Sequence, residues 1–375
     1  MRFWQKWQNF LSYFIRNKGL QPLGFIDLQG VKTPCFDNIK PLVFEFYYFF
    51  LFCMQTILLN KTGAPEVFKI EKKEDPKPKK DEVIVRNMAI GVNHIDVAIR
   101  KGQYQMPSLP LVLGNEACGI VSAVGSEVVD FKVGDRVAYA TSGIGAYAEK
   151  TAVVANCLVL PPKELTDSQV VAVLLKGLMA HTLLYRVYHA TLVKRVLIHA
   201  VTGGVGHILC QWARHLGIEV VGTVGSDQKI DFANSIGCNH VINYKTSNFV
   251  EELGKITNYN GVGIVYDSVG KDTILKSLEC LWPMGICISY GESSGVVEPI
   301  NLNHLIDNSL YLCRPSLPIF KNNRAELAIT AEQIFAMVKK GIIKPKITEF
   351  NFKDIVKAHQ LFENRTNIGS VVLTF

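Results

Sequence analysis

Residues 195–217, RVLIHAVTGGVGHILCQWARHLG, decide the fold class of this chain. The apolar run over 195–200 predicts a buried strand, and the glycine cluster that follows leads into a stretch with helical periodicity. In a strand–turn–helix of this kind the glycines let the backbone approach a pyrophosphate, while the helix N-terminus supplies N–H donors and partial positive charge. Val201 stands where the usual pattern has its first glycine, so a tight turn without a ligand is the alternative interpretation.

Downstream of this turn, strand and helix patterns alternate. Apolar runs at 219–225, 240–244, 263–270 and 286–291 read as strands, and DQKIDFANSIG at 227–237 reads as a helix between two of them. Strands that alternate with helices predict βαβ units, and therefore a doubly wound parallel sheet in an α/β fold.

Upstream, residues 54–160 contain short apolar runs separated by turn residues, which predict a β domain that resembles a barrel. Residues 54–73 begin this part as strand, turn and strand, and we expect the charged residues 72–80 to form a solvated loop. A buried helix is predicted over 170–188, and two helices and a final strand over 316–375.

Composition limits the classes of protein that this chain can be. Its 375 residues are 48% hydrophobic and 19% charged, which suits two domains with a sizeable core and excludes a disordered chain. The 40 Lys and Arg against 33 Asp and Glu give a net charge of only +7, so we expect no nucleic-acid partner. Nine scattered cysteines, without a CxxC pair, argue for a reducing compartment, and we expect a cytoplasmic location.

The first 53 residues differ from the rest of the chain. They contain 15 of its 37 Phe, Tyr and Trp residues. We interpret them as an atypical extension, appended or started too early, and expect the folded protein to be residues 54–375. A membrane span near 41–59 and an aromatic, basic surface helix over 1–16 are less favoured alternatives, so membrane contact through residues 1–53 stays open.

The end of the second predicted strand bears on the choice of nucleotide. NAD sites usually have an acid there, which binds the ribose 2′-hydroxyl. Here the strand ends in Gly225 and Ser226, and Lys229 and Tyr244 follow. A hydroxyl, an ammonium and a phenol suit a 2′-phosphate, so NADPH is favoured over NADH, although Asp227 would repel the phosphate if it pointed inward.

Many short motifs in order now give a specific resemblance. GVNHID, GNEACGIV, VGDRVAY, LLKG, HAVTGGVG, GTVGSDQK, VYDSVGKDT, SYGESSG and RPSL resemble the zeta-crystallin-like quinone oxidoreductase branch of the medium-chain dehydrogenase/reductase superfamily. The resemblance covers residues 54–375. It implies a GroES-like, β-barrel-type catalytic domain from 54–176 and 316–375 around a Rossmann NADPH-binding domain at 177–315. It also implies a homodimer and the reduction of quinones in a cleft between these domains.

The resemblance also bears on zinc. In the zinc alcohol dehydrogenases of this superfamily, a Cys and a His hold the catalytic metal at the places where this chain has Asn93 and Asn115. An amide is a poor zinc ligand, Cys118 nearby is alone, and the histidines are not at metal-ligand spacing. We therefore expect no metal.

Similarity to the family places a set of residues beside the cofactor. They are Asn93, His94, Ile95, Asp96, Val97, Gly203, Gly204, Val205, Gly206, Gly225, Ser226, Asp227, Gln228, Lys229, Tyr244, Val269, Gly291, Glu292, Ser293, Ser294, Pro315, Ser316, Leu317 and Arg365. Asn93 is also a candidate donor of a hydrogen bond to the substrate carbonyl, with a turn cap as the plainer interpretation. Asp96 is expected to be a structural hydrogen-bond acceptor rather than a general acid.

On the substrate side the residues are less informative. Tyr104 is a candidate aromatic wall of the quinone pocket, and a packed core tyrosine is the alternative. Ala98, Met179 and Thr182 depart from the family pattern, which puts the substrate range in doubt. No residue is assigned as proton donor, and water is expected to serve.

The sequence thus predicts a zinc-independent NADPH:quinone oxidoreductase, with either hydride or electron transfer from the nicotinamide to the quinone. Two alternatives are kept: an NADPH-dependent reductase of another activated double bond, such as an enal or enoyl thioester, and a non-catalytic NADPH- or RNA-binding protein of the zeta-crystallin kind.

Overall fold

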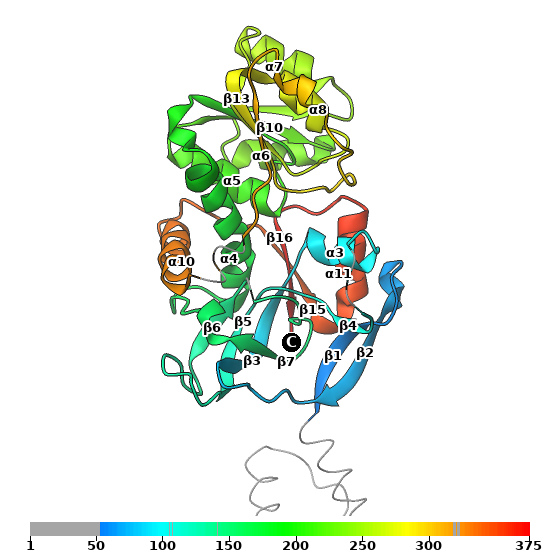
Figure 1. Ribbon diagram of the computed structural model, residues 1–375, viewed down its shortest axis with the longest axis vertical. Coiled ribbons are helices and arrows are strands. Elements are labelled where there is room, and N and C mark those ends of the chain that lie inside the picture. Colours follow the sequence, from blue (N-terminus) through cyan, green and yellow to red (C-terminus); the bar gives the residue numbers. More distant parts are fainter. Residues whose placement is uncertain (1–52, 105, 107, 141, 318–319, 321–322) are drawn as a thin grey trace, which may run out of the picture. The chain divides into compact units, whose positions relative to one another are not determined.

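The computed structural model describes residues 53–375, apart from residues 105, 107, 141, 318–319 and 321–322 (Figure 1). The described residues belong to one compact unit, Cys53–Phe375. The expectations for the first 53 residues therefore lie outside the described residues, except that Cys53 belongs to the first strand.

The described unit begins with a hairpin of β1 (Cys53–Leu59) and β2 (Phe68–Glu74), which confirms the predicted strand, turn and strand. β1 also pairs with β4 (Leu111–Val112). The prediction of a loop over 72–80 is wrong for its first three residues, since Glu74 pairs with Cys53 at the end of β2. An edge strand with exposed side chains can be as charged as a loop, and β2 is exposed beyond Phe68.

The second sheet takes strands from both ends of the described unit. Its order is β15-β16-β3-β5-β6-β8, and β7 pairs with β3. Only β15 and β16 are parallel. The strands are β3 (Glu82–Val92), β5 (Ala117–Val124), β6 (Arg136–Tyr139), β7 (Lys150–Val154), β8 (Leu158–Val159), β15 (Ile347–Asn351) and β16 (Ser370–Thr374). Alternate residues of β3, such as Val83 and Val85, are fully buried in its core.

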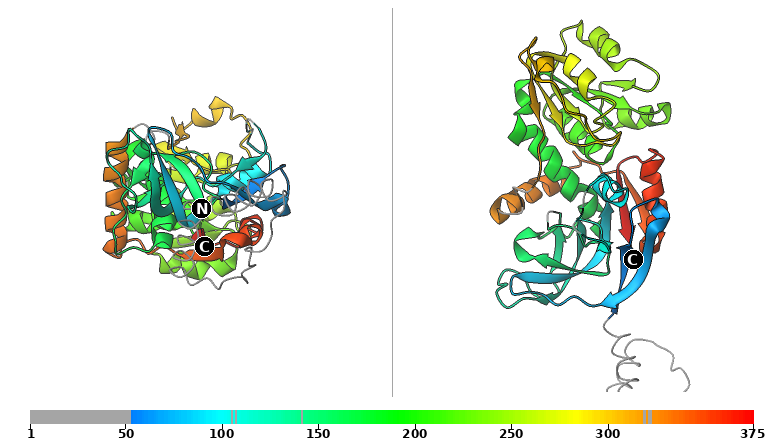
Figure 2. Two further views of the ribbon diagram at one scale, coloured as in Figure 1. Left: turned by 90° about the horizontal axis from the view of Figure 1, so that it is seen from below. Right: turned by 45° about the vertical axis from the view of Figure 1, so that its right-hand side comes forward.

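Two helices accompany this sheet, α3 (His94–Arg100) and α11 (Ile355–Glu363), and they lie side by side in Figure 1. The β1–β2 hairpin lies beside α11 (Figure 2), where the rings of Phe68 and His359 are 4.8 Å apart.

The third sheet is the predicted parallel one. Its order is β11-β10-β9-β12-β13-β14, and every neighbouring pair is parallel. The strands are β9 (Arg195–Ile198), β10 (Glu219–Val224), β11 (His240–Asn243), β12 (Val262–Asp267), β13 (Leu281–Ser289) and β14 (Tyr311–Cys313). The helices between them are α5 (Gly204–His215), α6 (Ile230–Ser235), α7 (Phe249–Thr257) and α8 (Ile274–Glu279). The strand order reverses between β9 and β12, which is where doubly wound sheets bind ligands.

Helix α4 (Asp167–His181) begins at a Thr166 cap that is closed by Gln169, and it continues as a π-helix over Thr182–Val187. Among the described residues only Asp167–Val187 has the length and mean hydropathy, 1.5, of a membrane span, but 67% of it is buried within the protein. It packs on α5, on β16 and on α10 (Arg324–Lys339), so its apolar character is explained by its place in the core (Figure 1). Short 3-10 turns occur at Pro65–Val67, Ala155–Cys157, Ala190–Leu192, Asp227–Lys229, Leu302–Leu305 and Phe352–Asp354.

Candidate functional site

The predicted cofactor contacts follow the carboxyl ends of all six parallel strands. Gly203 lies beyond β9, Gly225 beyond β10, Tyr244 directly after β11, Val269 beyond β12 and Gly291 beyond β13. Residues 315–317 lie beyond β14. Because the carboxyl ends of parallel strands share one edge of a sheet, a single edge carries all the contacts predicted for this half of the chain.

The glycine turn is built for a close approach between strand and helix. Gly203 caps α5, and the first helical hydrogen bond runs from the His207 N–H to the Gly203 carbonyl, 3.0 Å. A Cβ at Gly206 would lie 2.4 Å from the Ala200 carbonyl oxygen, so only glycine fits there. The first N–H groups of a helix have no acceptor within the helix, which makes this end suitable for an anion.

Val201 stands where the usual pattern has its first glycine, and the residue before it explains why no glycine is needed there. Ala200 has a left-handed backbone, with φ 49°, and so makes the tight turn itself. Val201 is fully buried, and its N–H bonds to the Thr223 carbonyl of β10, 3.0 Å. The departure from the usual glycine pattern therefore leaves the turn intact.

After the end of β10, the ammonium of Lys229 lies close in sequence to the carboxylate of Asp227, which a hydrogen bond holds in place. The Asn243 amide donates to Asp227 Oδ1 at 2.7 Å. Lys229 Nζ donates to the Arg365 carbonyl at 2.7 Å, which brings the segment just after α11 to this place. Partial burial lowers the pKa of the Lys229 ammonium. Gly225 leaves room against the Tyr244 hydroxyl, since a Cβ there would be 3.4 Å from that oxygen.

The loops after β12 and β13 are held together by a buried carboxylate that the sequence analysis did not single out. Asp267 accepts hydrogen bonds from the N–H groups of Val269 and Gly270, at 2.8 and 2.9 Å, and from the hydroxyls of Thr273 and Ser277. The Val269 carbonyl in turn accepts from Ser294 N and Oγ, at 2.8 and 2.7 Å. Val269 and Ser294, both predicted contacts, are therefore fixed side by side.

Tyr104 connects the loop after α3 with the loop after β13. Its hydroxyl donates to Glu292 Oε2 at 3.3 Å, and Arg314 contacts the same oxygen at 2.8 Å. Its side chain is 41% exposed, so the alternative of a packed core tyrosine is wrong. Partial desolvation opposes ionisation of Glu292, but the hydrogen bond from Arg314 lowers its pKa overall.

Asp96, in the first turn of α3, has the structural role that was expected. Its two carboxylate oxygens accept from the N–H groups of Asn93 and Gly114, at 2.8 and 3.2 Å. The side chain is fully buried, and burial raises its pKa to about 7. The next contacts, His94 and Val97, lie on the same helix, and the His94 ring packs edge-on against Phe362 at 4.8 Å.

Asn93 caps α3, and its amide is already engaged. Nδ2 donates to Glu116 Oε1 at 2.7 Å and to Asn115 Oδ1 at 3.3 Å. Both N–H groups are therefore in use, and the expectation that Asn93 donates to a substrate carbonyl does not hold in this structure. The plainer interpretation, a cap at a strand end, is confirmed.

Behind Asn93 lies a buried ion pair that the sequence analysis missed. Lys176 Nζ of α4 contacts Glu116 Oε1, and these side chains are 4% and 0% exposed. The sequence does contain a signal for this pair. Lys176 is the one charged residue in the apolar run VVAVLLKGLMAH, and a buried charge needs a partner. Two nearby residues that differ from the family pattern make ordinary core contacts. Met179 packs against the core, and the Thr182 hydroxyl donates a hydrogen bond to the Leu178 carbonyl at 2.8 Å.

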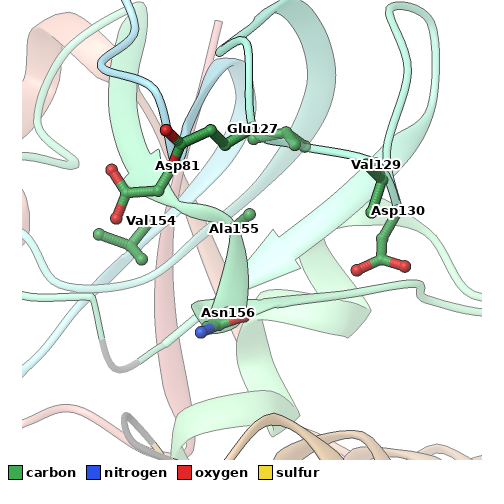
Figure 3. A pocket seen from close by; sticks show the side chains of 8 residues that line it. Asp81, Glu127, Val129, Asp130, Val154, Ala155 and Asn156 are labelled. Atoms are coloured by element: carbon green, nitrogen blue, oxygen red, sulfur yellow. The ribbon is translucent and has the colours of Figure 1, made fainter.

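The described residues contain no metal centre, and their acidic surface hollow is a poor cofactor site. No group of three or more His, Cys, Asp or Glu among the described residues is arranged to hold a metal ion. A surface hollow beside β7 contains the carboxylates of Asp81, Glu127 and Asp130 (Figure 3), and none of the predicted contacts lines it. Its negative charge would repel a dinucleotide, so the carboxyl edge of the parallel sheet is the better candidate.

Comparison with known proteins agrees with this geometry. Residues 204–322 match the family model described as zinc-binding dehydrogenase, and residues 79–163 match the alcohol dehydrogenase GroES-like domain. Quinone oxidoreductase 1 of Escherichia coli (strain K12) is 42% identical over 321 residues, which are 84% of this chain and 98% of that protein. A 2-haloacrylate reductase of Burkholderia sp. is 39% identical over 84% of this chain and 97% of that protein. The crystal structure of Escherichia coli quinone oxidoreductase complexed with NADPH superposes with a TM-score of 0.83 at 41% identity, and covers 86% of this chain and 100% of that one.

Proposed function

Because the chain belongs to the quinone oxidoreductase branch of the medium-chain dehydrogenase/reductase superfamily, we propose that it is an enzyme that reduces a quinone with NADPH. The observation that carries this proposal is the line of predicted contacts along the carboxyl edge of the six-stranded sheet. The structure of a relative in complex with NADPH covers 86% of this chain, and it supports the same cofactor.

The residues present fit the cofactor. The N-terminus of α5 and the turn at residues 203–206 would hold the diphosphate, since Gly206 lets the helix approach the strand. Lys229, Ser226 and Tyr244 would hold a 2′-phosphate, and Asn243 restrains the Asp227 carboxylate that would oppose it. When bound, NADPH supplies a hydride from C4 of its nicotinamide.

The protein's own residues bind, orient and exclude water. Asp267 fixes the loop that carries Val269, and the Tyr104–Glu292–Arg314 contacts hold the loops after α3, β13 and β14 against one another. A quinone is already electrophilic, so positioning contributes most of the rate enhancement that these residues supply. The reduced ring then takes up a proton from water, which gives the hydroquinone.

We propose that the reaction is independent of zinc. Asn93 directs N–H groups, not a lone pair, toward Glu116, and Lys176 places a positive charge on that same carboxylate. A divalent cation beside Glu116 would be repelled by the Lys176 ammonium, and Asn93 and Asn115, at the places of the Cys and His ligands, offer only amides, which are poor zinc ligands. Metal analysis of the purified protein should find less than one zinc for ten chains.

We further propose the organisation that the resemblance implies: a catalytic part from 54–176 and 316–375, and a nucleotide-binding part at 177–315. The boundary at 176/177 falls within α4, so the two parts share that helix. A homodimer is supported by the exposed edge strand β14. A cytoplasmic location is supported by the nine scattered cysteines of the chain, which form no CxxC pair.

The test is a fluorescence titration with NADPH and NADH, followed by turnover assays. We expect NADPH to bind at least about tenfold more tightly than NADH, because one charge-assisted contact to a phosphate is worth about 1.5–3 kcal/mol. We also expect rapid oxidation of NADPH with 1,4-benzoquinone and slow oxidation with 2-chloroacrylate or crotonyl-CoA. The opposite order of substrates would favour the reductase of activated double bonds to which the haloacrylate relative points. Binding of NADPH with no turnover of any acceptor would favour a non-catalytic protein.

A further inference from the structure

Four polar side chains form a continuous hydrogen-bonded line beside the glycine turn. It runs from Lys176 to Glu116, from Glu116 to Asn93, and from Asn93 to Asn115. Lys176 also reaches the turn, because a Cβ at Gly204 would lie 3.6 Å from its Cγ. The line therefore connects the cofactor turn with Asn115, at the position where zinc-containing members of the superfamily have a metal ligand.

The two charged members fix the direction of every hydrogen bond in the line. An ammonium only donates and a carboxylate only accepts, so the Asn93 amide must turn its NH2 toward Glu116. The second N–H of that NH2 meets Asn115 Oδ1 at 3.3 Å. Asn115 must then accept with its oxygen and present its own NH2 on the opposite side, where Nδ2 has no hydrogen-bond partner among the described residues.

The buried pair is hard to explain as a source of stability. Removing two charges from water costs more than their attraction commonly returns, and well-packed apolar replacements are often as stable. Glu116 Oε2, in addition, is buried with no hydrogen-bond partner among the described residues. A pair that imposes one orientation on two neighbouring amides has a use that an apolar pair could not serve.

We propose that Lys176 and Glu116 are positioning residues that fix this polarity, and that Asn115 Nδ2 is the catalytic hydrogen-bond donor to the carbonyl oxygen of the bound quinone. This assignment rests on the proposed function. The hydride would add with its electron pair to a ring carbon conjugated with that carbonyl, so that the ring C=C π pair shifts, the C=O π pair moves onto oxygen, and the Asn115 N–H stabilises the negative charge of the enolate. Protonation of this oxygen, followed by loss of the ring proton and uptake of a proton on the other carbonyl oxygen, then gives the hydroquinone. Asn115 keeps its proton, and water protonates the product.

Two substitutions at Asn115 test the donor. We expect Asn115→Leu to lower kcat with 1,4-benzoquinone roughly 100-fold, the usual loss when one donor to a developing oxyanion is removed. The Kd for NADPH should stay within about twofold, and Asn115→Ser, which keeps a donor, should recover at least about tenfold of the lost kcat. Wild-type kcat in Asn115→Leu, or no difference between Leu and Ser, would overturn the assignment.

A double substitution tests the positioning residues. Lys176→Met/Glu116→Gln removes both charges together, so no unpaired charge is buried, and it should lower kcat about tenfold while the melting temperature changes by only a few degrees. The matched control is Lys339→Met/Glu164→Gln, which removes the exposed pair of the same types at 2.8 Å and should behave as wild type. Equal kcat in the two double variants would contradict the positioning role. If the buried double variant does not fold, the Asn115 variants and the exchange measurement below still decide.

The polarity itself can be measured without turnover. In ¹⁵N spectra of the full chain, assigned through Asn93→Leu and Asn115→Leu, both side-chain NH2 protons of Asn93 should exchange slowly with water and those of Asn115 quickly. The reverse order would refute the inference even in an active enzyme. If the wild-type protein is inactive but shows the expected exchange order, the proposed function and the donor role of Asn115 are refuted. The fixed orientation of the Asn93 and Asn115 amides would then be the only part of the inference that stands.

Discussion

Gly204 and Gly206 lie two residues apart in the first turn of α5, but they have very different room for a side chain. A Cβ at Gly206 would lie 2.4 Å from the Ala200 carbonyl, while one at Gly204 would meet nothing nearer than 3.6 Å. We expect Gly206→Ala to displace the turn, with an overpacking cost of about 1–3 kcal/mol and a Kd for NADPH at least about tenfold higher. Gly204→Ala should leave the melting temperature near wild type, because its Cβ would meet no protein atom nearer than 3.6 Å. Fluorescence titration measures the Kd of Gly206→Ala, and equal effects of the two substitutions on thermal unfolding would contradict this account of the turn.

Lys229 should decide which nicotinamide cofactor is used. Removal of its ammonium in Lys229→Ala should raise the KM for NADPH by about 10- to 100-fold, because a charge-assisted hydrogen bond to phosphate is lost, and should leave that for NADH unchanged. The control is Lys255→Ala on α7, whose exposed ammonium pairs with Glu252 at 2.7 Å. A parallel loss with both cofactors would mean that Lys229 acts on the fold through its bond to the Arg365 carbonyl rather than on the phosphate.

Single residues also show where sequence reasoning stops. The positions of Gly203, Lys229 and Tyr244 could be predicted because each follows a strand whose apolar run is clear in the sequence. The polarity of Asn93 could not, since it depends on Lys176 and Glu116, which come from two other elements and are 83 and 23 residues away. Asp227 is a similar case, because only the structure shows that the Asn243 amide restrains it.

Among the elements, α11 contributes a buried histidine that makes stability depend on pH. His359 is fully buried, Nε2 lies 3.2 Å from the Tyr147 hydroxyl, and Phe68 of β2 packs on the ring. Burial first, and then the charge of Arg100, lowers its pKa from 6.5 to about 3. Below pH 6.5, His359 is therefore protonated in the unfolded chain, while in the folded chain it stays neutral until the pH approaches 3. The contribution of His359 to the free energy of unfolding is fully present above pH 6.5, and it falls by at most about 1.4 kcal/mol per pH unit as the pH drops toward 3.

His359→Gln should remove this contribution and flatten the pH dependence. We expect the variant to be less stable than wild type at pH 7.5, because ring packing is lost, and to lose less stability between pH 6.5 and 4.5. Urea unfolding at several pH values measures both quantities. Curves that stay parallel across this range would show that His359 is not the titrating group.

The elements that were missed are those with little periodicity of their own. Helix α7 has only nine residues, with Phe249 and Leu253 as its main buried side chains, and was not predicted. Strand β14 has three residues that are mostly exposed, and its pairing with Ile286 and Ile288 of β13 identifies it only in three dimensions. By contrast α4, α5 and the central strands are long or apolar enough to be predicted from the sequence alone.

At the scale of the whole molecule, β14 leaves one edge of the parallel sheet open among the described residues. Its exposed side chains include Tyr311 and Leu312, and Met284, Leu302 and Ile306 are exposed in the segments before it. An apolar edge strand favours pairing with a second chain, and two copies of β14 could continue the sheet across a twofold axis. The wild-type protein should therefore have twice the 41.8 kDa mass of one chain in light scattering.

A charge at this edge should separate the two chains. Tyr311→Glu places a carboxylate on each copy of β14, and two such charges close to the axis repel each other while the edge loses an aromatic contact. We expect the mass to fall to that of one chain at micromolar concentration. Leu192→Glu is the control, because Leu192 is also exposed, at 72%, but lies in the turn before β9. A Tyr311→Glu protein that remains dimeric would exclude β14 as the contact and would direct the search to the other exposed apolar side chains. Since the loop after β14 carries residues 315–317, separation of the chains should also weaken NADPH binding, whereas a dimer built elsewhere would leave it unchanged.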